Sequence, residues 1–191
     1  MVDLMFSRAF WHPFGAHGDE GPDEILARKR GEVERNGWTL WSFQHRRPEV
    51  LAAWHRDLAT VGGRSIAICS DSPSARSPSG QVEYCSHFKL VDHDAWVPMP
   101  AGITVPHPFR ATRRNASAFV VNRIIYPIDV GDLPAVEWLL SDGAWRRDRL
   151  PTHGEYLLRR GGASPIRKPL AVLELRAPFL ATVGFGPAPN A

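Results

Sequence analysis

The sequence has little lysine and little cysteine, and it has no long apolar run. Its 23 basic residues are 20 arginines and 3 lysines, and there are 2 cysteines in 191 residues. No apolar stretch approaches the roughly 18–20 residues that a membrane-spanning helix needs. The first residues lack the basic, apolar and small-residue sections of a secretory signal. We therefore expect a cytoplasmic protein with no membrane partner.

The common catalytic and cofactor motifs are also missing. There is no Gly-x-Gly-x-x-Gly, Gly-Lys-Ser/Thr, Gly-x-Ser-x-Gly or His-Glu-x-x-His, which removes the usual signatures of nucleotide binding, α/β-hydrolases and zinc proteases. Cys69 and Cys85 stand in expected strands and not in a Cys-x-x-Cys pair, so we expect both to be buried and reduced. Cys85 and His87 would share one face of a strand, but no spacing nominates further ligands. We expect no metal and no cofactor.

What is present is the composition of one globular domain. Hydrophobic residues make up 43% and charged residues 23% of the chain. This length is enough for a single core, so we expect one domain over 1–191 with a loose tail at 184–191. The net charge of +3 is uneven, because 1–60 carries 8 Lys and Arg against 9 Asp and Glu, and 61–191 carries 15 against 11. Arginine clusters bind phosphate or form solvated loops; the candidates are Arg110, Arg113, Arg114, Arg146 and Arg147.

Two helices are predicted in the first third of the chain. Pro22 suits the first position of a helix and Asn36-Gly37 is a stop signal, so the first helix should cover 22–35. Most of it, Glu32 included, is expected to be exposed, with a docking stripe of Ile25, Leu26 and Val33. A second helix should begin at Pro48 and end at Gly62-Gly63. Its buried face has helical spacing and consists of Val50, Leu51, Trp54, Leu58 and Val61.

Most of the predicted strands come later in the chain. They cover 5–11, 65–70, 81–90, 117–128, 154–160 and 168–177, with a loop at 12–22, an irregular excursion over 91–115 and a short helix from Asp132 through Leu140. In the strand at 81–90, Val82, Tyr84, Phe88 and Leu90 should share one face, opposite Glu83, Cys85, His87 and Lys89. The element order predicts an α+β fold with a mixed, mainly antiparallel sheet, or a small β-barrel with flanking helices.

The segment from Asn36 to Arg46 is the densest aromatic stretch, and it lies between the two predicted helices. In an extended strand, Trp41 and Phe43 point one way while Trp38, Leu40, Ser42 and Gln44 point the other. One face could then be core and the other the wall of a pocket for a base, since flat rings stack on bases and amide or hydroxyl groups read their polar edges. Equally, both tryptophans could be core residues.

The order of elements resembles the PUA-like superfamily, especially its EVE and ASCH branches. The resemblance rests on the segments Gly37-Trp-Thr-Leu-Trp-Ser-Phe43, Ile66-Ala-Ile-Cys-Ser-Asp71, Ala118–Pro127 and Leu170–Leu175 in this order. It implies a compact β-barrel that binds RNA or modified bases in an aromatic-walled pocket. Pocket residues would be Phe14, Trp38, Trp41 and Ser42 as the wall and Gln44 and Ser70 as polar readers, with the arginine clusters on phosphate.

These observations favour a non-catalytic protein that binds nucleic acid or a modified nucleobase. One alternative is a small hydrolase-type enzyme acting on a nucleoside-like compound, because the predicted loop at 12–22 offers acid and base groups: His12, His17, Asp19 and Glu20. Another alternative is a protein-interaction domain in which the aromatic residues are simply core.

Overall fold

The structure, a computed structural model, describes the greater part of the chain. Its backbone is described over 10–14, 20–43, 46–60, 62–69, 84–106, 115–129, 136–139, 145–146, 158–160 and 169–186. Side chains are described over 20–43, 46–59, 62–63, 84–106, 115–126 and 171–186.

Both predicted helices are confirmed: α1 covers Pro22–Asn36 and α2 covers Pro48–Thr60. The Glu24 carboxylate accepts a hydrogen bond from the Gly21 N–H at 2.7 Å at the start of α1. Gly37 ends α1 with a φ of 77°, a left-handed conformation that glycine adopts without strain, and its N–H donates to Val33 O at 2.8 Å. These local signals fix the two ends of α1 and therefore the point at which the next segment begins.

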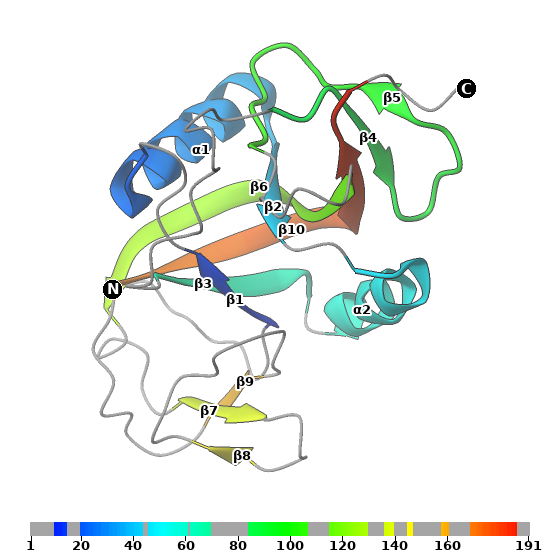
Figure 1. The fold of residues 1–191 in the computed structure, drawn as a ribbon. Coiled ribbons are helices and arrows are strands. Elements are labelled where there is room, and N and C mark those ends of the chain that lie inside the picture. The colour runs from blue at the N-terminus through cyan, green and yellow to red at the C-terminus, as the bar shows by residue number, and fades with distance from the viewer. Residues whose placement is uncertain are drawn as a thin grey trace, which may run out of the picture.

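A seven-stranded sheet forms the body of the protein (Figure 1). Strand β10 pairs with β6 along most of its length, and its other edge pairs first with β3 and then with β4. The pair β1–β3 is parallel and the other described pairs in this sheet are antiparallel, so the predicted mixed, mainly antiparallel α+β fold is confirmed. The strands are β1 (Phe10–Phe14), β2 (Thr39–Phe43), β3 (Arg64–Cys69), β4 (His87–Leu90), β5 (Val97–Pro98), β6 (Asn115–Asp129) and β10 (Pro169–Gly184).

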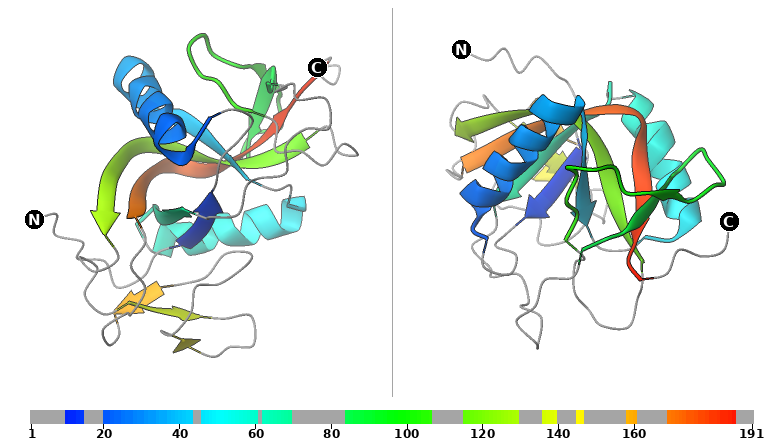
Figure 2. Two further views of the ribbon diagram at one scale, coloured as in Figure 1. Left: turned by 60° about the vertical axis from the view of Figure 1, so that its left-hand side comes forward. Right: turned by 90° about the horizontal axis from the view of Figure 1, so that it is seen from above.

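The two long strands β6 and β10 bend strongly (Figure 2). The register of their pairing shifts between Leu175 and Leu180. In the same stretch, the other edge of β10 changes its pairing partner from β3 to β4. Irregular pairing of this kind increases local bending. The sheet is therefore curved, and residues of both helices pack in one hydrophobic cluster with β2, β6 and β10.

Three sequence predictions about secondary structure are wrong. The helix expected from Asp132 through Leu140 is replaced by strand β7 (Val136–Leu139), whose valine and tryptophan suit a strand; it pairs with β8 (Trp145–Arg146) and β9 (Leu158–Arg160) in a second sheet. The loop expected at 12–22 starts too early, because β1 extends through Phe14 and pairs with β3. The strand expected from residue 81 begins only at His87.

The late start of β4 has a clear cause in hydrogen bonding. Tyr84 forms a bridge to Pro106 and the Cys85 N–H donates to Val105 O, whereas His87 pairs with Gly184 of β10. The chain thus changes partner at Ser86. As a result Tyr84 is 49% exposed instead of sharing a buried face with Phe88. Cys85 packs in the cluster that contains Phe88, so Cys85 and His87 do not share a face.

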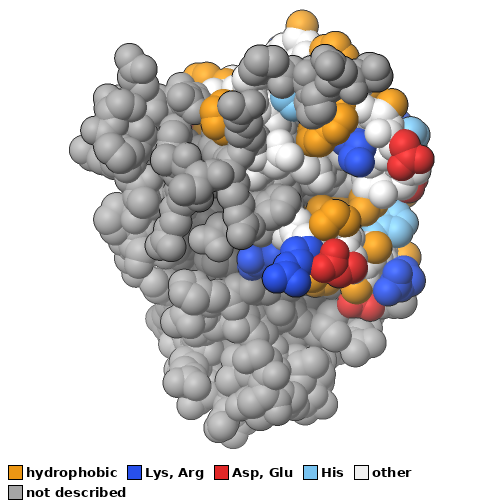
Figure 3. Space-filling model, turned by 45° about the vertical axis from the view of Figure 1, so that its right-hand side comes forward, with side chains coloured by type: hydrophobic (Ala, Val, Ile, Leu, Met, Phe, Trp, Pro, Cys, Tyr) orange, Lys and Arg blue, Asp and Glu red, His pale blue; other side chains and the backbone are white. Residues whose placement is uncertain are grey.

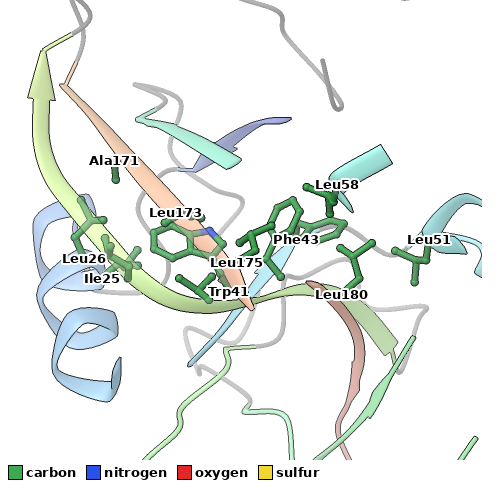
Figure 4. Packing of buried hydrophobic residues seen from close by; sticks show 13 residues of the cluster. Ile25, Leu26, Trp41, Phe43, Leu51, Leu58, Ala171, Leu173, Leu175 and Leu180 are labelled. Carbon is green, nitrogen blue, oxygen red and sulfur yellow. The ribbon is translucent and has the colours of Figure 1, made fainter. Parts of the chain in front are cut away.

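The curved sheet carries a hydrophobic cluster on each face. On the concave face, Trp41 and Phe43 of β2 pack with residues of both helices, Ile25 and Leu26 at one end and Leu51 and Leu58 at the other (Figure 4). On the opposite face, Leu40 packs with residues of the 84–106 segment and of β6 and β10. The predicted alternation along β2 is confirmed, but both of its faces are packed. Neither of the two described helices is long and apolar enough to cross a membrane.

Candidate functional site

The predicted pocket residues of β2 divide into buried and accessible ones. Trp41 is only 3% exposed and lies in the concave core, where its indole stabilises the fold. Trp38 is half-buried, with its ring centroid 5.7 Å from that of Phe88. Ser42 is half-buried and donates from Oγ to Pro106 O at 3.2 Å. Among these three residues, Trp38 and Ser42 are the ones whose side chains reach the surface.

The other predicted site residues are placed only in part. Glu20 accepts two hydrogen bonds from Arg28, at 2.6 Å from Nε and 2.7 Å from Nη2, so its carboxylate is occupied by an ion pair. The backbone of Phe14 and His12 lies in β1 and that of Arg146 in β8, but their side chains are not among those described. Outside the described residues lie His17, Asp19, Gln44, Ser70, Arg110, Arg113, Arg114 and Arg147.

A polar row continues from the concave core toward the edge of the sheet. Phe43 of β2 lies opposite Ser117 of β6, Ser117 lies opposite Thr182 of β10, and Thr182 lies opposite Lys89 of β4. Residues directly opposite one another in antiparallel strands place their side chains on the same face. Along this row the side chains therefore change from apolar on β2, through hydroxyl groups on β6 and β10, to a cation on β4.

A tryptophan with a cation stands at each end of this row. At one end, Trp54 of α2 packs on Phe43 with ring centroids 5.8 Å apart, and the Arg46 guanidinium lies 5.6 Å from the Trp54 ring centroid. The Arg46 N–H also donates to Ser117 Oγ at 2.9 Å. At the other end, Lys89 Nζ lies 5.8 Å from the ring centroid of Trp96. We call this surface the cation–aromatic face; it comprises Arg46, Trp54, Lys89, Trp96 and Thr182, and the fully buried Ser117 lies beneath it.

An exposed ion pair stands beside this face at the start of α2. Arg47 is 82% exposed, and its Nη1 lies 4.0 Å from the carboxylate of Glu49, which is 68% exposed. A pair so exposed is screened by water and leaves the guanidinium available to other anions. Figure 3 shows Lys and Arg side chains at two levels on this side of the molecule, with Asp and Glu side chains beside them at both levels.

A buried imidazole lies in the next row of the same face. His87 is opposite Gly184, and a Cβ on Gly184 would stand 2.4 Å from His87 Nε2. The Ser86 hydroxyl donates its one proton to Gly186 O at 3.0 Å, so it accepts from His87 Nδ1, also at 3.0 Å. Burial lowers the pKa of His87. His87 is therefore neutral at neutral pH, with the proton on Nδ1 and its ring edge-on to Trp96.

A buried charged network holds the segment before β6 against β2. Lys29 Nζ donates to Glu32 Oε2 at 2.9 Å, to Thr39 Oγ1 at 3.3 Å and to Thr104 O at 2.6 Å. Glu32 also accepts from Thr104 N at 3.1 Å and from Arg28 Nη1 at 3.2 Å, and the Thr39 hydroxyl donates to it. These contacts fasten Thr104 to α1 and to Thr39 of β2.

The expectation that Glu32 is exposed is wrong, because this network buries it completely: Glu32 is 0% and Lys29 3% exposed. Burial lowers the pKa of Lys29 to about 8, against the opposing attraction of Glu32. Burial alone would raise the pKa of Glu32, but Lys29 and the hydroxyl of Thr39 more than offset it, and the pKa is lowered. All three N–H bonds of Lys29 have acceptors, so this lysine holds structure and offers no free nucleophile.

The sequence pattern missed Lys89, Trp96 and Thr182 as surface partners. Trp96 falls in the predicted excursion, and its position beside Lys89 follows from the turn between β4 and β5. The described residues contain no group of three or more His, Cys, Asp or Glu side chains that could hold a metal ion. Comparisons with protein-family models, curated proteins and solved structures found no significant match.

Proposed function

We propose that the protein binds nucleic acid or a modified nucleobase and catalyses no reaction. The observation that carries the proposal is the pairing of a tryptophan with a cation at both ends of the cation–aromatic face. Aromatic rings stack on bases, worth about 1–3 kcal/mol per base, while arginine and lysine attract phosphates. Between the two pairs, Thr182 brings a half-buried hydroxyl group to the face.

The proposal shifts the binding surface away from Trp41. A ligand that contacted this indole would have to enter the packed core, whereas Trp54 and Trp96 are half-buried at the surface. Trp38 and Ser42 lie on the opposite face of β2, where Trp38 packs against the cluster that contains Leu40 and Ser42 donates to Pro106 O. We therefore assign the main contacts to the cation–aromatic face.

The proposal includes a PUA-like barrel architecture and a cytoplasmic location. Two features support the architecture: β6 and β10 bend strongly, and β10 changes partner from β3 to β4 along one edge. Both features bring the ends of a sheet toward closure. The cytoplasm is where single-stranded RNA would be available to such a protein.

The direct test is a titration of tryptophan fluorescence with single-stranded DNA and RNA hexanucleotides, with and without modified bases. We expect saturable binding at micromolar protein that weakens as salt is raised, because phosphate contacts release counterions. Lys89→Gln should reduce the salt dependence. Its matched control is Arg30→Gln, which removes an exposed charge from α1, away from the face. Absence of binding by any of these ligands, or equal effects of the two variants, would contradict the proposal.

A further inference from the structure

The distance between the two cation–aromatic pairs sets the length of ligand that can contact both of them. Phe43, Ser117, Thr182 and Lys89 lie on four consecutive strands, so three gaps between strands separate the ends of the row. Neighbouring strands are about 4.8 Å apart, which puts the ends of the row about 14 Å apart. Trp54 packs on the first residue of the row, and Trp96 lies beside the last. A single base is too small to contact both tryptophans.

We propose that the face takes a single strand of several nucleotides, with two bases of the same strand stacked at its two ends. The inference rests on the proposed function and commits it to a single-stranded oligonucleotide. Stacked bases advance about 3.4 Å per nucleotide, so 14 Å corresponds to about four such steps, or fewer in an unstacked strand. A hexanucleotide is therefore long enough, and a mononucleotide is not.

The two ends differ in how they receive a base. At the α2 end, the Arg46 guanidinium lies 5.6 Å from the Trp54 ring centroid, and the base is received by this arginine–tryptophan pair. At the β4 end, Lys89 lies over Trp96 as a point charge with a flexible stem, so it can move to a phosphate and leave the indole to the base. The intervening phosphates pass over Thr182, whose half-buried hydroxyl group lies between the cations.

Charge supports this occupant over an acidic peptide. A strand of nucleic acid has a charge at every step and a ring at every step, and the face alternates cation and ring at both ends. An acidic peptide would engage Lys89 and Arg46 through its carboxylates but would bring no flat rings to Trp54 and Trp96. Acidic groups do stand nearby, Glu49 beside Arg47 and Asp92 in the turn after β4, and they lie outside the row itself.

The test is a series of oligothymidylates of one, two, three, four and six nucleotides, followed by tryptophan fluorescence at fixed salt. Two linked contacts gain affinity through effective concentration. We expect the hexanucleotide to bind at least about a hundredfold more tightly than the mononucleotide. Trp96→Ala should reduce the affinity for the hexanucleotide to near that of the mononucleotide, whereas the control Arg30→Gln should leave both affinities within about threefold of the parent.

Trp54 also packs on Phe43, so its replacement could disturb the fold; Arg46→Gln is the second variant at that end, and its circular dichroism should match that of the parent. If the mononucleotide and hexanucleotide bind with affinities within about threefold, the two-ended inference is wrong while the binding function stands. If neither a short nor a long oligonucleotide binds, the proposed function fails and the inference with it. If an acidic peptide competes equally with the hexanucleotide, the choice of a nucleic-acid occupant is overturned.

Discussion

Replacing Lys29 with methionine tests the buried network most sharply. The substitution keeps most of the side-chain volume and removes the ammonium group, whose three hydrogen bonds reach Glu32, Thr39 and Thr104. Glu32 would remain completely buried with one of its two cations gone. Removing one partner of a buried ion pair costs about 3–5 kcal/mol, because the other charge stays buried without compensation. We expect a loss of this size for Lys29→Met.

The charge of Glu32 can be removed in turn to separate its effect from packing. Lys29→Met combined with Glu32→Gln leaves a neutral side chain of the same shape, so the double variant should be more stable than Lys29→Met alone. The matched control is Arg30→Met, the neighbouring exposed residue of α1, which should change stability by no more than about 0.5 kcal/mol.

The assay is urea unfolding followed by tryptophan fluorescence, with stabilities obtained by linear extrapolation. A Lys29→Met variant within about 1 kcal/mol of the parent would refute the reasoning. The reasoning would also be refuted if the double variant were no more stable than Lys29→Met. The stability lost in Lys29→Met would then come from lost packing and not from the unpaired carboxylate of Glu32.

Three further predictions follow from single contacts. The pKa of Lys29 is lowered from 10.5 to about 8, so between these pH values the folded chain binds fewer protons than the unfolded chain, and the contribution of Lys29 to stability rises with pH. The difference in unfolding free energy between parent and Lys29→Met should therefore be larger at pH 10 than at pH 8. Gly184→Ala would press a methyl group against His87, lowering stability by about 1–3 kcal/mol, with partial recovery in Gly184→Ala/His87→Ala by thermal unfolding. Phe119→Ala should cost about 3–5 kcal/mol in the same measurement, since Phe119 is fully buried; a loss under 1 kcal/mol would contradict its place in the core.

Local signals in the sequence were enough to predict the helices and the core strands. The Pro22 start, the Asn36-Gly37 stop and the helical spacing of Leu51 and Leu58 each encode structure within a few residues, and each is confirmed. Val136–Leu139 was assigned to a helix because Pro134 and Asp132 resemble a helix start, whereas pairing with β8 and β9 decides its conformation.

The candidate site was less predictable because it depends on long-range register. Lys89 and Phe43 are separated by 46 positions in sequence and lie in one row only because β6 and β10 stand between their strands. The burial of Lys29 and Glu32 likewise depends on Thr104, which reaches α1 from a distant segment. A helix with many charged residues is predicted to be exposed when the sequence alone is used, because the partner that buries some of these charges is not visible in it.

Photo-crosslinking tests the central claim most directly. A single-stranded hexanucleotide that contains a photoreactive thymidine analogue would be irradiated with the protein, and the crosslinked residues would be identified by mass spectrometry. We predict crosslinks at Trp96 and Trp54 or at residues adjacent to them, suppressed by an excess of unlabelled hexanucleotide. Crosslinks confined to other surfaces, such as the exposed side of α1, or no crosslinks that a competitor suppresses, would contradict the assignment of nucleic-acid binding to the cation–aromatic face.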